Sequence, residues 1–321
     1  MLKKAMILAA GFGTRLRPLT HHIPKPLMPV ANLSIIEHHF KRLKKMGIQE
    51  VMLNLHHLPE VIKSTIGSGE QWGLKVHYSL ETPEVLGTGG GLAKVKEFFQ
   101  DEEAFLLLNG DILHEIDLEK AWAQHQKTQA AASLLLRTHP GDQSGWIGVD
   151  GDGWVKRVPE MDGSEGLEKF AFTGLHILTP HILPFLPKGE SYCILRKGYR
   201  GMLEQGLKVS AIYTEAPGWN DIGTPKDYLE ANLKVLTGTP LESAEGLNNK
   251  GEIVGAVLLG QDITIEEGAK VGPNVVLGDG CFIGKGTTVQ DSVILPGTQV
   301  EGERAFSRAI LFQQGEIILE E

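Results

Sequence analysis

Short apolar runs alternate with amphipathic stretches over the first third of the chain. Residues 5–10, 51–55 and 104–108 are almost entirely apolar, as in strands that are buried on both faces of a parallel sheet. Between these runs, residues 34–46 carry apolar side chains at helical spacing and end at Gly47, and residues 59–66 begin with a proline. The pattern predicts an α/β fold in which helices cover a mostly parallel sheet, with strands at 1–10, 51–55, 74–79 and 104–108.

The pattern changes at residue 130. Residues 130–182 contain short segments separated by turns, which predict an extension of the sheet with strands at 133–137, 146–149, 154–158 and 170–178. A helix is expected at 226–236, followed by a polar stretch that contains Gly, Pro and an Asn-Asn pair. We therefore expect one domain over residues 1–236 and a linker over residues 237–250.

The tail has a hydrophobic period of six. A period of six is not helical, and it fits a three-sided coil of about 18 residues in which each aliphatic side chain points into a prism. The run covers fewer than three full coils, so its ends need a cap or a partner. We expect residues 251–321 to form a short β-helix, with residues 309–312 and 317–319 as the cap or an oligomer contact. The periodic residues are Ile253, Leu259, Ile265, Val271, Leu277, Ile283, Val289 and Leu295.

The composition argues against several classes of protein. The net charge of −9 does not favour general binding of nucleic acid, which requires a basic face. The longest apolar runs are far shorter than the ~18 residues that span a bilayer, and the first run is too short for a secretory signal. The two cysteines, Cys193 and Cys281, form no disulfide framework, so a cytoplasmic location is expected.

A glycine-containing turn with cations follows the first strand. Gly11 and Gly13 allow a sharp turn, Arg15 and Arg17 come next, and Lys25 stands between two prolines. The backbone N–H groups of such a turn, with cations close behind, suit phosphate groups. The turn lacks the Gly-Lys-Ser/Thr of a P-loop and the third glycine of the dinucleotide fingerprint. The sequence therefore predicts a phosphate-binding loop of another kind.

The chain between Met6 and Val30 contains Leu-Ala-Ala-Gly-Phe-Gly-Thr-Arg-Leu-Arg-Pro-Leu-Thr and Pro-Lys-Pro-Leu-Met-Pro-Val. This stretch resembles the signature of the sugar-1-phosphate nucleotidyltransferases (NDP-sugar pyrophosphorylases), and is similar to the mannose-1-phosphate guanylyltransferases or the N-acetylmuramate-1-phosphate uridylyltransferases among them. The tail resembles the hexapeptide-repeat extension that some members carry. The resemblance implies a Rossmann-like nucleotidyltransferase domain and a C-terminal left-handed parallel β-helix.

The resemblance also implies a reaction, in which a sugar-1-phosphate oxygen attacks the α-phosphorus of a nucleoside triphosphate and pyrophosphate leaves. A phosphate monoester has a second pKa of about 6, so it is largely dianionic near neutral pH and needs no general base. By motif position, Arg15 is the cation at the leaving phosphates and Lys25 lies near the α-phosphate. Asp111 and Asp221 match the family's two metal aspartates, so Mg²⁺ is the expected cofactor.

The same resemblance gives the residues that bind the two substrates. Glu81 precedes the second glycine-rich run, where the family reads the edge of the base. An ionised carboxylate only accepts hydrogen bonds, and guanine offers two neighbouring N–H groups, so Glu81 slightly favours GTP. The nucleotide is expected at Ala10, Gly11, Gly13, Thr14, Glu81, Gly87, Thr88 and Gly89. The sugar phosphate is expected at Gly148, Arg157, Lys169, Thr173 and Gly174.

One part of the family pattern is missing. The family commonly has Glu-Lys-Pro with its lysine on the sugar phosphate, whereas this chain has Arg157-Val158-Pro159. Arg157, Lys156 or Lys169 must then substitute for the lysine, or sugar binding differs. Some members specific for N-acetylmuramate 1-phosphate also lack the triad. Trp219 either stacks on the sugar or belongs to the core.

Three classes of function are compared. The leading hypothesis is a nucleotidyltransferase, with GTP and mannose 1-phosphate slightly preferred over UTP and N-acetylmuramate 1-phosphate. A catalytically silent regulatory subunit would be expected to lack Arg15, Lys25 or one aspartate, and all four are present. A hexapeptide acyltransferase needs a base, and the tail contains no histidine. The expected partners are the two substrates and further copies of the chain, without nucleic acid or membrane.

Overall fold

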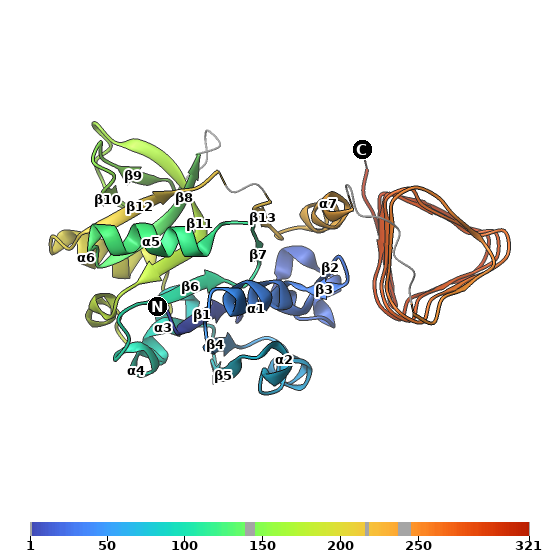
Figure 1. Ribbon diagram of the computed structural model, residues 1–321, viewed down its shortest axis with the longest axis horizontal. Helices are drawn as coiled ribbons and strands as arrows, with labels where there is room; N and C mark the ends of the chain where they lie inside the picture. Colours follow the sequence, from blue (N-terminus) through green and yellow to red (C-terminus); the bar gives the residue numbers. More distant parts are fainter. Residues whose placement is uncertain (1, 139–144, 216–217, 237–244, 321) are drawn as a thin grey trace. The chain divides into compact units, whose positions relative to one another are not determined.

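The computed structural model describes residues 2–138, 145–215, 218–236 and 245–320 (Figure 1). The chain forms two compact units, and neither is one continuous segment. The first unit comprises Met1–Phe12 and Ile36–Trp219, and the second comprises Gly13–Ile35 and Asn220–Glu321. The domain division at residues 236 and 251 stays a prediction, and most of the predicted linker lies outside the described residues. The contacts group the tract after Phe12 with the C-terminal part.

The first unit is built on a nine-stranded sheet among the described residues. Four parallel strands form one half, and the next strand, β11, runs antiparallel to β6 and continues the sheet. β8 and β12 lie beyond β11, and β9 and β10 pair at its outer end. The predicted mostly parallel sheet with an extension is confirmed. The strands of this sheet are β1 (Lys4–Leu8), β4 (Glu50–Leu55), β5 (Lys75–Leu80), β6 (Phe105–Asn109), β8 (Ala132–Thr138), β9 (Ile147–Val149), β10 (Val155–Arg157), β11 (Glu168–Leu178) and β12 (Val209–Tyr213). The short strand β7 (Ile112–Leu113) lies outside it.

The helices of the first unit match the prediction where the apolar spacing is regular. α1 (Ile35–Lys45) and α2 (Pro59–Ile66) lie where helices are expected. α5 (Leu118–Thr128) and β12 are not predicted from the sequence, although α5 begins at an aspartate cap: the Asp117 carboxylate accepts a hydrogen bond from the backbone N–H of Lys120. The remaining helices are α3 (Gly87–Lys94), α4 (Lys96–Phe99) and α6 (Arg200–Glu204).

Two buried histidines make the stability of the first unit depend on pH. His125 Nδ1 lies 2.7 Å from the Ser133 hydroxyl, and His176 Nδ1 lies 2.8 Å from the Tyr199 hydroxyl. Burial lowers the pKa of His125 to about 4 and the pKa of His176 to about 3. Both values lie below the unfolded value of about 6.5, so the unfolded chain takes up the protons first. Their contribution is present above that pH and is lost as the pH falls towards the folded-state values.

We expect the free energy of unfolding to fall by about 1 kcal/mol per pH unit for each such histidine between about pH 6.5 and about pH 4.5. His125→Asn removes one titrating group, so its curve should be flatter over this range even though its stability at pH 7 is lower. Urea unfolding at a series of pH values measures both slopes. Parallel curves for the two proteins would contradict the assignment.

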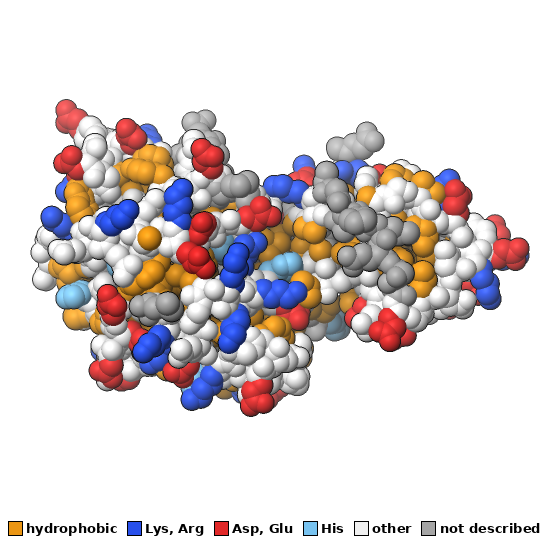
Figure 2. All heavy atoms as spheres, viewed as in Figure 1, with side chains coloured by type: hydrophobic (Ala, Val, Ile, Leu, Met, Phe, Trp, Pro, Cys, Tyr) orange, Lys and Arg blue, Asp and Glu red, His pale blue; other side chains and the backbone are white. Residues whose placement is uncertain are grey.

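Charged side chains of both signs are interspersed on the face shown in Figure 2, and the chain as a whole carries a net charge of −9. Among the residues that the structure describes, none of the helices has the length and apolar character that crossing a membrane requires.

The second unit contains a three-sided β-helix, whose coils are seen end-on in Figure 1. Its faces are parallel sheets of four, four and five strands, the last strand of the third being antiparallel. The predicted β-helix is thus confirmed, and its handedness stays a prediction. The strands are β14 (Asn248–Asn249), β17 (Thr264–Ile265), β20 (Phe282–Ile283) and β23 (Gln299–Val300); β15 (Glu252–Ile253), β18 (Lys270–Val271), β21 (Thr288–Gln290) and β24 (Ala305–Ser307); β16 (Val257–Leu259), β19 (Val275–Leu277), β22 (Ser292–Ile294), β25 (Ala309–Phe312) and β26 (Gly315–Ile318). The unit also holds β2 (Pro29–Val30), β3 (Leu33–Ser34), β13 (Asn220–Asp221) and α7 (Pro225–Val235).

Two details of the predicted repeat are wrong. Each face has at least four rungs, so the β-helix contains more than the predicted number of coils. The period also shortens: Leu259 pairs with Leu277 eighteen residues later, but Leu277 pairs with Ile294 seventeen residues later. Ile294 therefore takes the core position predicted for Leu295. The later repeat is one residue shorter, and the strands of successive coils still pair in register.

The end of the β-helix is a hairpin. β26 runs antiparallel to β25 and pairs from Ala309↔Ile318 to Phe312↔Gly315, so the last rung is followed by a strand of the opposite direction. This arrangement terminates the parallel ladder, as the predicted cap requires. An oligomer contact through residues 309–312 and 317–319 stays a prediction.

A second hairpin, β2–β3, is tied to the rest of its unit at the turn. The turn residues Ala31 and Asn32 have φ angles of 51° and 60°. The N–H of Ala31 donates to Asn232 Oδ1 of α7 at 2.9 Å, and Asn32 Nδ2 donates to the carbonyl of Leu277 in β19 at 3.0 Å. The Tyr228 hydroxyl of α7 also donates to a carbonyl of β2, at 2.5 Å. The hairpin is thus joined both to α7 and to the β-helix.

Candidate active site

The tract after Phe12 folds as short 3₁₀ turns, at Thr14–Leu16, Leu19–His21 and Lys25–Leu27. Gly13 has a φ of 61°, and its carbonyl accepts a hydrogen bond from the Thr20 hydroxyl at 2.8 Å. A Cβ on Gly13 would stand 2.9 Å from Thr20 Cγ2. Both the left-handed backbone and the lack of space therefore require glycine at this position.

Arg15 and Asp221 meet in the second unit. Arg15 Nη2 lies 3.9 Å from Asp221 Oδ2, and a Cβ on Gly223 would stand 2.8 Å from Arg15 Nη1. The two side chains are 63% and 44% exposed, so the pair is loosely held and open to solvent. The structure thus brings a predicted catalytic cation beside a predicted metal ligand, with a glycine leaving room for the guanidinium.

Lys25 is buried beside the same glycine turn. Only 7% of the residue is exposed, which is unusual for lysine. Its Cβ lies 3.2 Å from the place where a Cβ on Gly13 would stand. Thr20 packs on Gly13. Arg15 belongs to the turn before Thr20 in the chain, and Lys25 belongs to a turn after it.

Asp111 follows β6 in the first unit. The N–H of Gly110 donates to the carbonyl of Leu8 at 2.9 Å, and a Cβ on Gly110 would stand 2.5 Å from that oxygen. The carboxyl ends of β1 and β6 therefore meet, as the topology predicts. Within the described residues, no cluster of three or more His, Cys, Asp or Glu side chains suits a metal ion. Aspartate oxygens are nevertheless the donors that Mg²⁺ prefers when substrate oxygens and water complete its shell.

Glu81 is buried and hydrogen-bonded within the first unit. Its Oε1 accepts from Asn54 Nδ2 at 2.8 Å, and its Oε2 accepts from the N–H of Leu86 at 2.7 Å. Asn54 Oδ1 in turn accepts from the N–H of Ala9 at 2.8 Å. Glu81 and Asn54 are 1% and 2% exposed. Because both carboxylate oxygens already accept a hydrogen bond from the protein, this geometry does not support the argument that Glu81 favours guanine.

The glycine-rich run after Leu86 forms the start of the helix α3. The N–H of Gly89 donates to the Tyr192 carbonyl at 3.0 Å, and the Thr88 hydroxyl accepts from the N–H of Ile194 at 2.8 Å. The segment around Tyr192 therefore lies directly against the helix and leaves no space for a Cβ. The closest atoms would be Tyr192 Cε2 at 2.2 Å for Gly89, the Glu190 carbonyl oxygen at 2.1 Å for Gly90 and Glu81 Oε1 at 2.7 Å for Gly91.

Two of the predicted sugar-phosphate cations gather on Trp146. Arg157 Nη1 donates to the Trp146 carbonyl at 3.0 Å, and its guanidinium lies 3.8 Å from the centroid of the Trp146 ring. Lys169 Nζ lies 5.0 Å from the same centroid. A Cβ on Gly148 would stand 2.9 Å from the Trp146 ring and from Arg157 Cβ, so Gly148 is closely packed in this cluster.

Thr173, Gly174 and Trp219 lie together in the first unit. The Thr173 hydroxyl is buried and donates to the Leu135 carbonyl at 2.7 Å, while its carbonyl accepts from Trp219 Nε1 at 2.8 Å. Gly174 has a φ of 86°, and a Cβ there would stand 2.1 Å from Ile112 Cδ1. These contacts explain both residue types by packing, and any contact with the sugar phosphate stays a prediction.

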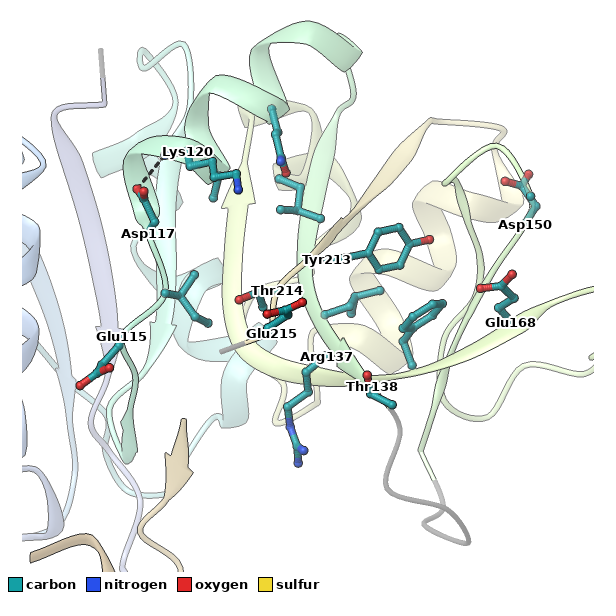
Figure 3. Close-up of a pocket in the computed structure, with 17 residues that line it drawn as sticks. Glu115, Asp117, Lys120, Arg137, Thr138, Asp150, Glu168, Tyr213, Thr214 and Glu215 are labelled. Carbon is teal, nitrogen blue, oxygen red and sulfur yellow. Dashed lines mark hydrogen bonds between the residues drawn. The ribbon is translucent and has the colours of Figure 1, made fainter. Parts of the chain in front are cut away.

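A pocket of about 910 Å³ opens at the carboxyl ends of β8 and β12 (Figure 3). Phe170 and Tyr213 contribute an aromatic wall, with ring centroids 4.7 Å apart. The charged side chains that line the pocket are Glu115, Asp117, Asp150, Glu168, Glu215, Lys120 and Arg137. Because acidic side chains outnumber basic ones, the pocket itself is poorly suited to a phosphate group.

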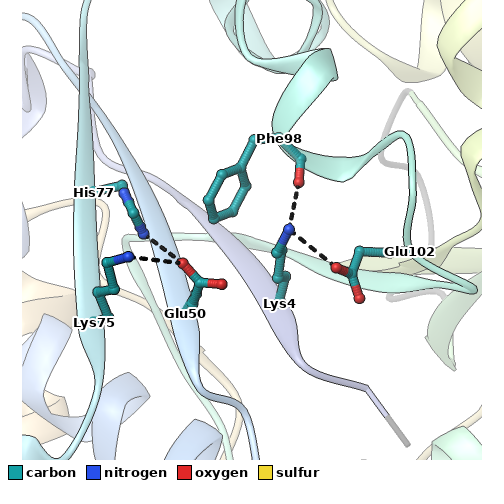
Figure 4. Close-up of polar contacts among 6 residues, drawn as sticks. All are labelled: Lys4, Glu50, Lys75, His77, Phe98 and Glu102. Carbon is teal, nitrogen blue, oxygen red and sulfur yellow. Dashed lines mark hydrogen bonds and ion pairs between the residues drawn. The ribbon is translucent and has the colours of Figure 1, made fainter.

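Ion pairs join side chains at the amino ends of the parallel strands (Figure 4). Glu50 lies 2.7 Å from His77 Nε2 and 3.7 Å from Lys75 Nζ, while Lys4 donates to the Phe98 carbonyl and pairs with Glu102 at 3.0 Å. These groups satisfy one another at the amino ends of the parallel strands.

His39 and His114 form a buried pair close to Asp111. Their ring centroids are 5.9 Å apart. Burial lowers the pKa of His39 to about 4 and the pKa of His114 to about 3, although the charge of Asp111 acts to raise that of His39. Both rings are therefore neutral near pH 7.

Comparison with protein families matches residues 4–238 to the family described as Nucleotidyl transferase, and residues 253–318 to the GMPPB C-terminal domain. The first match covers both the glycine turn with its cations and the two aspartates. The chain belongs to the nucleotidyl transferase family.

Two of the curated relatives described here span almost the whole of this nucleotidyl transferase, and a third spans about two thirds of it. A UTP–glucose-1-phosphate uridylyltransferase from Synechocystis sp. is 32% identical over 98% of this chain and 90% of its own length. A mannose-1-phosphate guanylyltransferase from Mycobacterium tuberculosis is 30% identical over 92% of this chain and 81% of its own. An N-acetylmuramate alpha-1-phosphate uridylyltransferase from Neisseria meningitidis serogroup B is 35% identical over 69% of this chain and 93% of its own.

The structure gives two further residues of this nucleotidyl transferase, Asn54 and Arg137, contacts that no motif predicts. Asn54 belongs to no motif. Its one signal in the sequence is its place inside an apolar strand, next to Leu55, because a polar residue there needs a buried partner. Arg137 likewise follows an apolar run, near the end of β8, and belongs to no recognised motif.

Proposed function

We propose that this nucleotidyl transferase transfers a nucleoside monophosphate from a nucleoside triphosphate to a sugar 1-phosphate, giving an NDP-sugar and pyrophosphate. The observation that carries the proposal is the meeting of Arg15 and Asp221 over Gly223 at 3.9 Å, beside the Gly13 turn. Such a site offers a cation for departing phosphates next to a carboxylate for a divalent metal. The relatives, which are all sugar-1-phosphate nucleotidyltransferases by name, support the same reaction.

The residues have separate tasks in this proposal. The guanidinium of Arg15 binds oxygens of the β- and γ-phosphates and neutralises the charge of the leaving pyrophosphate. The buried ammonium of Lys25 lies near the α-phosphate. Asp111 and Asp221 would hold Mg²⁺, which when bound supplies charge neutralisation and aligns phosphate oxygens. The nucleophile is the sugar phosphate oxygen, so no side chain has to remove a proton.

The preferred substrates in this proposal are GTP and mannose 1-phosphate. The guanylyltransferase relative matches 92% of this chain and the muramate enzyme 69%, so the first resembles the catalytic part and the tail together. The match of the tail to the GMPPB C-terminal domain supports the same choice. The alternative is a uridylyltransferase, favoured by the 32% identity to the glucose-1-phosphate enzyme and by the loss of the Glu81 argument for guanine.

Release of pyrophosphate with Mg²⁺ tests the proposal directly. The four common nucleoside triphosphates are crossed with mannose 1-phosphate, glucose 1-phosphate and N-acetylmuramate 1-phosphate. Turnover of GTP with mannose 1-phosphate above all other pairs is expected. A strong UTP pair would replace the preferred substrates, and tight binding of an NDP-sugar without turnover of any pair would overturn the enzymatic proposal.

Arg15→Lys should lower kcat for the best pair about 10- to 100-fold. The variant keeps one positive charge but loses the two-pronged contact of the guanidinium with phosphate oxygens. Lys226→Gln removes an exposed cation from the first turn of the nearby helix α7 and should leave kcat unchanged. Steady-state assays of the three proteins make the comparison, and equal kcat values for wild type and Arg15→Lys would contradict the role of Arg15.

Two further expectations belong to this proposal. We infer that copies of the chain associate through the C-terminal β-helix, where Ile318 of the last strand is 59% exposed. We also infer a cytoplasmic location, since both Cys193 and Cys281 are free thiols. Light scattering of the purified chain and of Ile318→Lys measures the association of copies. A lower mass is expected for the variant, and an unchanged mass would count against the β-helix as the contact.

A further inference from the structure

The cation that binds the phosphate of the sugar 1-phosphate is not assigned by the family pattern, because the lysine of Glu-Lys-Pro is absent. The expected substitutes are occupied elsewhere. Arg157 and Lys169 lie on Trp146, and Lys156 Nζ pairs with Asp150 Oδ2 at 3.3 Å. Lys156 would have to leave this ion pair to reach a phosphate, and Arg157 the hydrogen bond from its Nη1 to the Trp146 carbonyl. Lys169, for which the ring contact is described, is the competing candidate.

Arg137, near the end of β8, is differently placed. Its guanidinium lies 4.0 Å from the centroid of the Trp219 ring, so its flat face is covered by the indole. Its Nε is buried and has no hydrogen-bond partner among the described residues. Burial also lowers the pKa of this guanidinium from its ordinary value. A partly buried guanidinium with an unused N–H can donate a hydrogen bond to an anionic ligand.

The contacts of Trp219 lead from Arg137 towards β6, which precedes Asp111. Trp219 Nε1 donates to the Thr173 carbonyl, and the next residue, Gly174, packs against the Asn109 and Ile112 side chains on both sides of Asp111. β8 pairs with β11, which pairs with β6. Strands lie about 4.8 Å apart, so β8 is about 10 Å from β6, a distance that a hexose phosphate can bridge.

The surroundings of Arg137 leave its guanidinium on the side away from the acidic pocket. Figure 3 shows the side chain extending away from Tyr213 and from the carboxylates of Asp150 and Glu168. Arg137 is one of the residues that line the pocket, and its guanidinium lies on the Trp219 ring. A phosphate could therefore approach the guanidinium without entering the acidic pocket.

We propose that Arg137, held flat on Trp219, binds the phosphate of the sugar 1-phosphate in place of the missing lysine. This inference rests on the proposed function, since it names a substrate contact of that reaction. Stacking on the indole uses the face of the guanidinium and leaves N–H donors in its plane, which match phosphate oxygens two at a time. Trp219 is then a positioning residue, because it orients the guanidinium and the guanidinium touches the substrate.

Calorimetric titration of the full chain with mannose 1-phosphate, glucose 1-phosphate and N-acetylmuramate 1-phosphate tests this role, with the phosphate-free sugars titrated in parallel. For the sugar phosphate that binds, Arg137→Gln should raise Kd about 10- to 100-fold, and Arg137→Lys should raise it less because it keeps the charge. The affinity for the phosphate-free sugar should not change. Lys120→Gln, which removes the other cation of the same pocket, should leave Kd as in wild type.

The outcomes separate this inference from the proposed function. If none of the three sugar phosphates binds wild type, both are overturned. If one binds wild type and Arg137→Gln equally well, or if Arg157→Gln or Lys169→Gln carries the loss, only the role of Arg137 is overturned. Thermal unfolding checks each variant; should Arg137→Gln fail to fold, Arg137→Lys decides, and a wild-type Kd in that variant overturns the inference.

Discussion

Asp221→Asn and Asp111→Asn should each lower kcat/KM about 100- to 1000-fold with the best substrate pair. Each change keeps the shape of the side chain and removes one negative charge from a ligand of the expected Mg²⁺. The amide remains an oxygen donor, but it attracts a divalent cation more weakly than a carboxylate does. Raising the Mg²⁺ concentration should therefore recover part of the lost activity.

The position of Asp221 calls for a control on its second contact. Asp221 also lies 3.9 Å from Arg15, so Asp221→Asn weakens an ion pair as well as a metal ligand. The two effects differ in their dependence on Mg²⁺, because only the loss of a ligand is relieved by more metal. Initial rates over a wide range of Mg²⁺ concentration make the distinction, with the exposed Asp101→Asn as a matched variant that should behave as wild type. A loss that is equal at every concentration would show that Asp221 acts through Arg15.

The second large effect is expected at Asn54. Asn54→Asp places two carboxylates 2.8 Å apart in a buried site, where Asn54 and Glu81 are 2% and 1% exposed. An uncompensated buried charge costs about 3–5 kcal/mol, so the variant should lose a large share of its free energy of unfolding at pH 7. Urea unfolding measures the loss.

A second substitution should reverse it. In Asn54→Asp combined with Glu81→Gln, the glutamine amide donates to the new aspartate and its oxygen still accepts from the N–H of Leu86. The link to the N–H of Ala9 also remains, so the double variant should return to within about 1 kcal/mol of wild type. If the double variant is no more stable than Asn54→Asp, the hydrogen bonds of this link do not determine the stability. If it is stable but binds nucleotide poorly, the charge of Glu81 is needed by the ligand.

The parts of the fold that could be predicted are those with a local pattern. The apolar strands β1, β4 and β6 and the amphipathic helix α1 follow from spacing alone. α3 was harder to predict as a helix that begins inside a glycine run, because its reason is the contact with Tyr192, more than a hundred positions away along the chain. The core position of Ile294 was missed because a skipped residue in one turn shifts the period without changing the composition.

The candidate site shows the same limit. Arg15, Lys25, Asp111 and Asp221 stand in motifs that can be recognised one at a time. The ring that contacts Arg157 and Lys169, and the indole beneath Arg137, belong to Trp146 and Trp219, and these contacts are visible only after folding. For the same reason Glu81 looked free in the sequence, while in the structure it is bonded on both oxygens.

The hydrogen bonds at the β2–β3 turn bear on how this protein can be recombined. Ala31 and Asn32 are bonded to α7 and to β19, and the tract that carries Arg15 and Lys25 belongs to the same compact unit as the β-helix. A chimaera that exchanges only the C-terminal repeats with those of a relative therefore keeps the bond of Asn32 only if the new repeats place a backbone carbonyl where that of Leu277 lies. The segment that can be exchanged intact is discontinuous: it has to include residues 13–35 as well as the part of the chain that begins at Asn220.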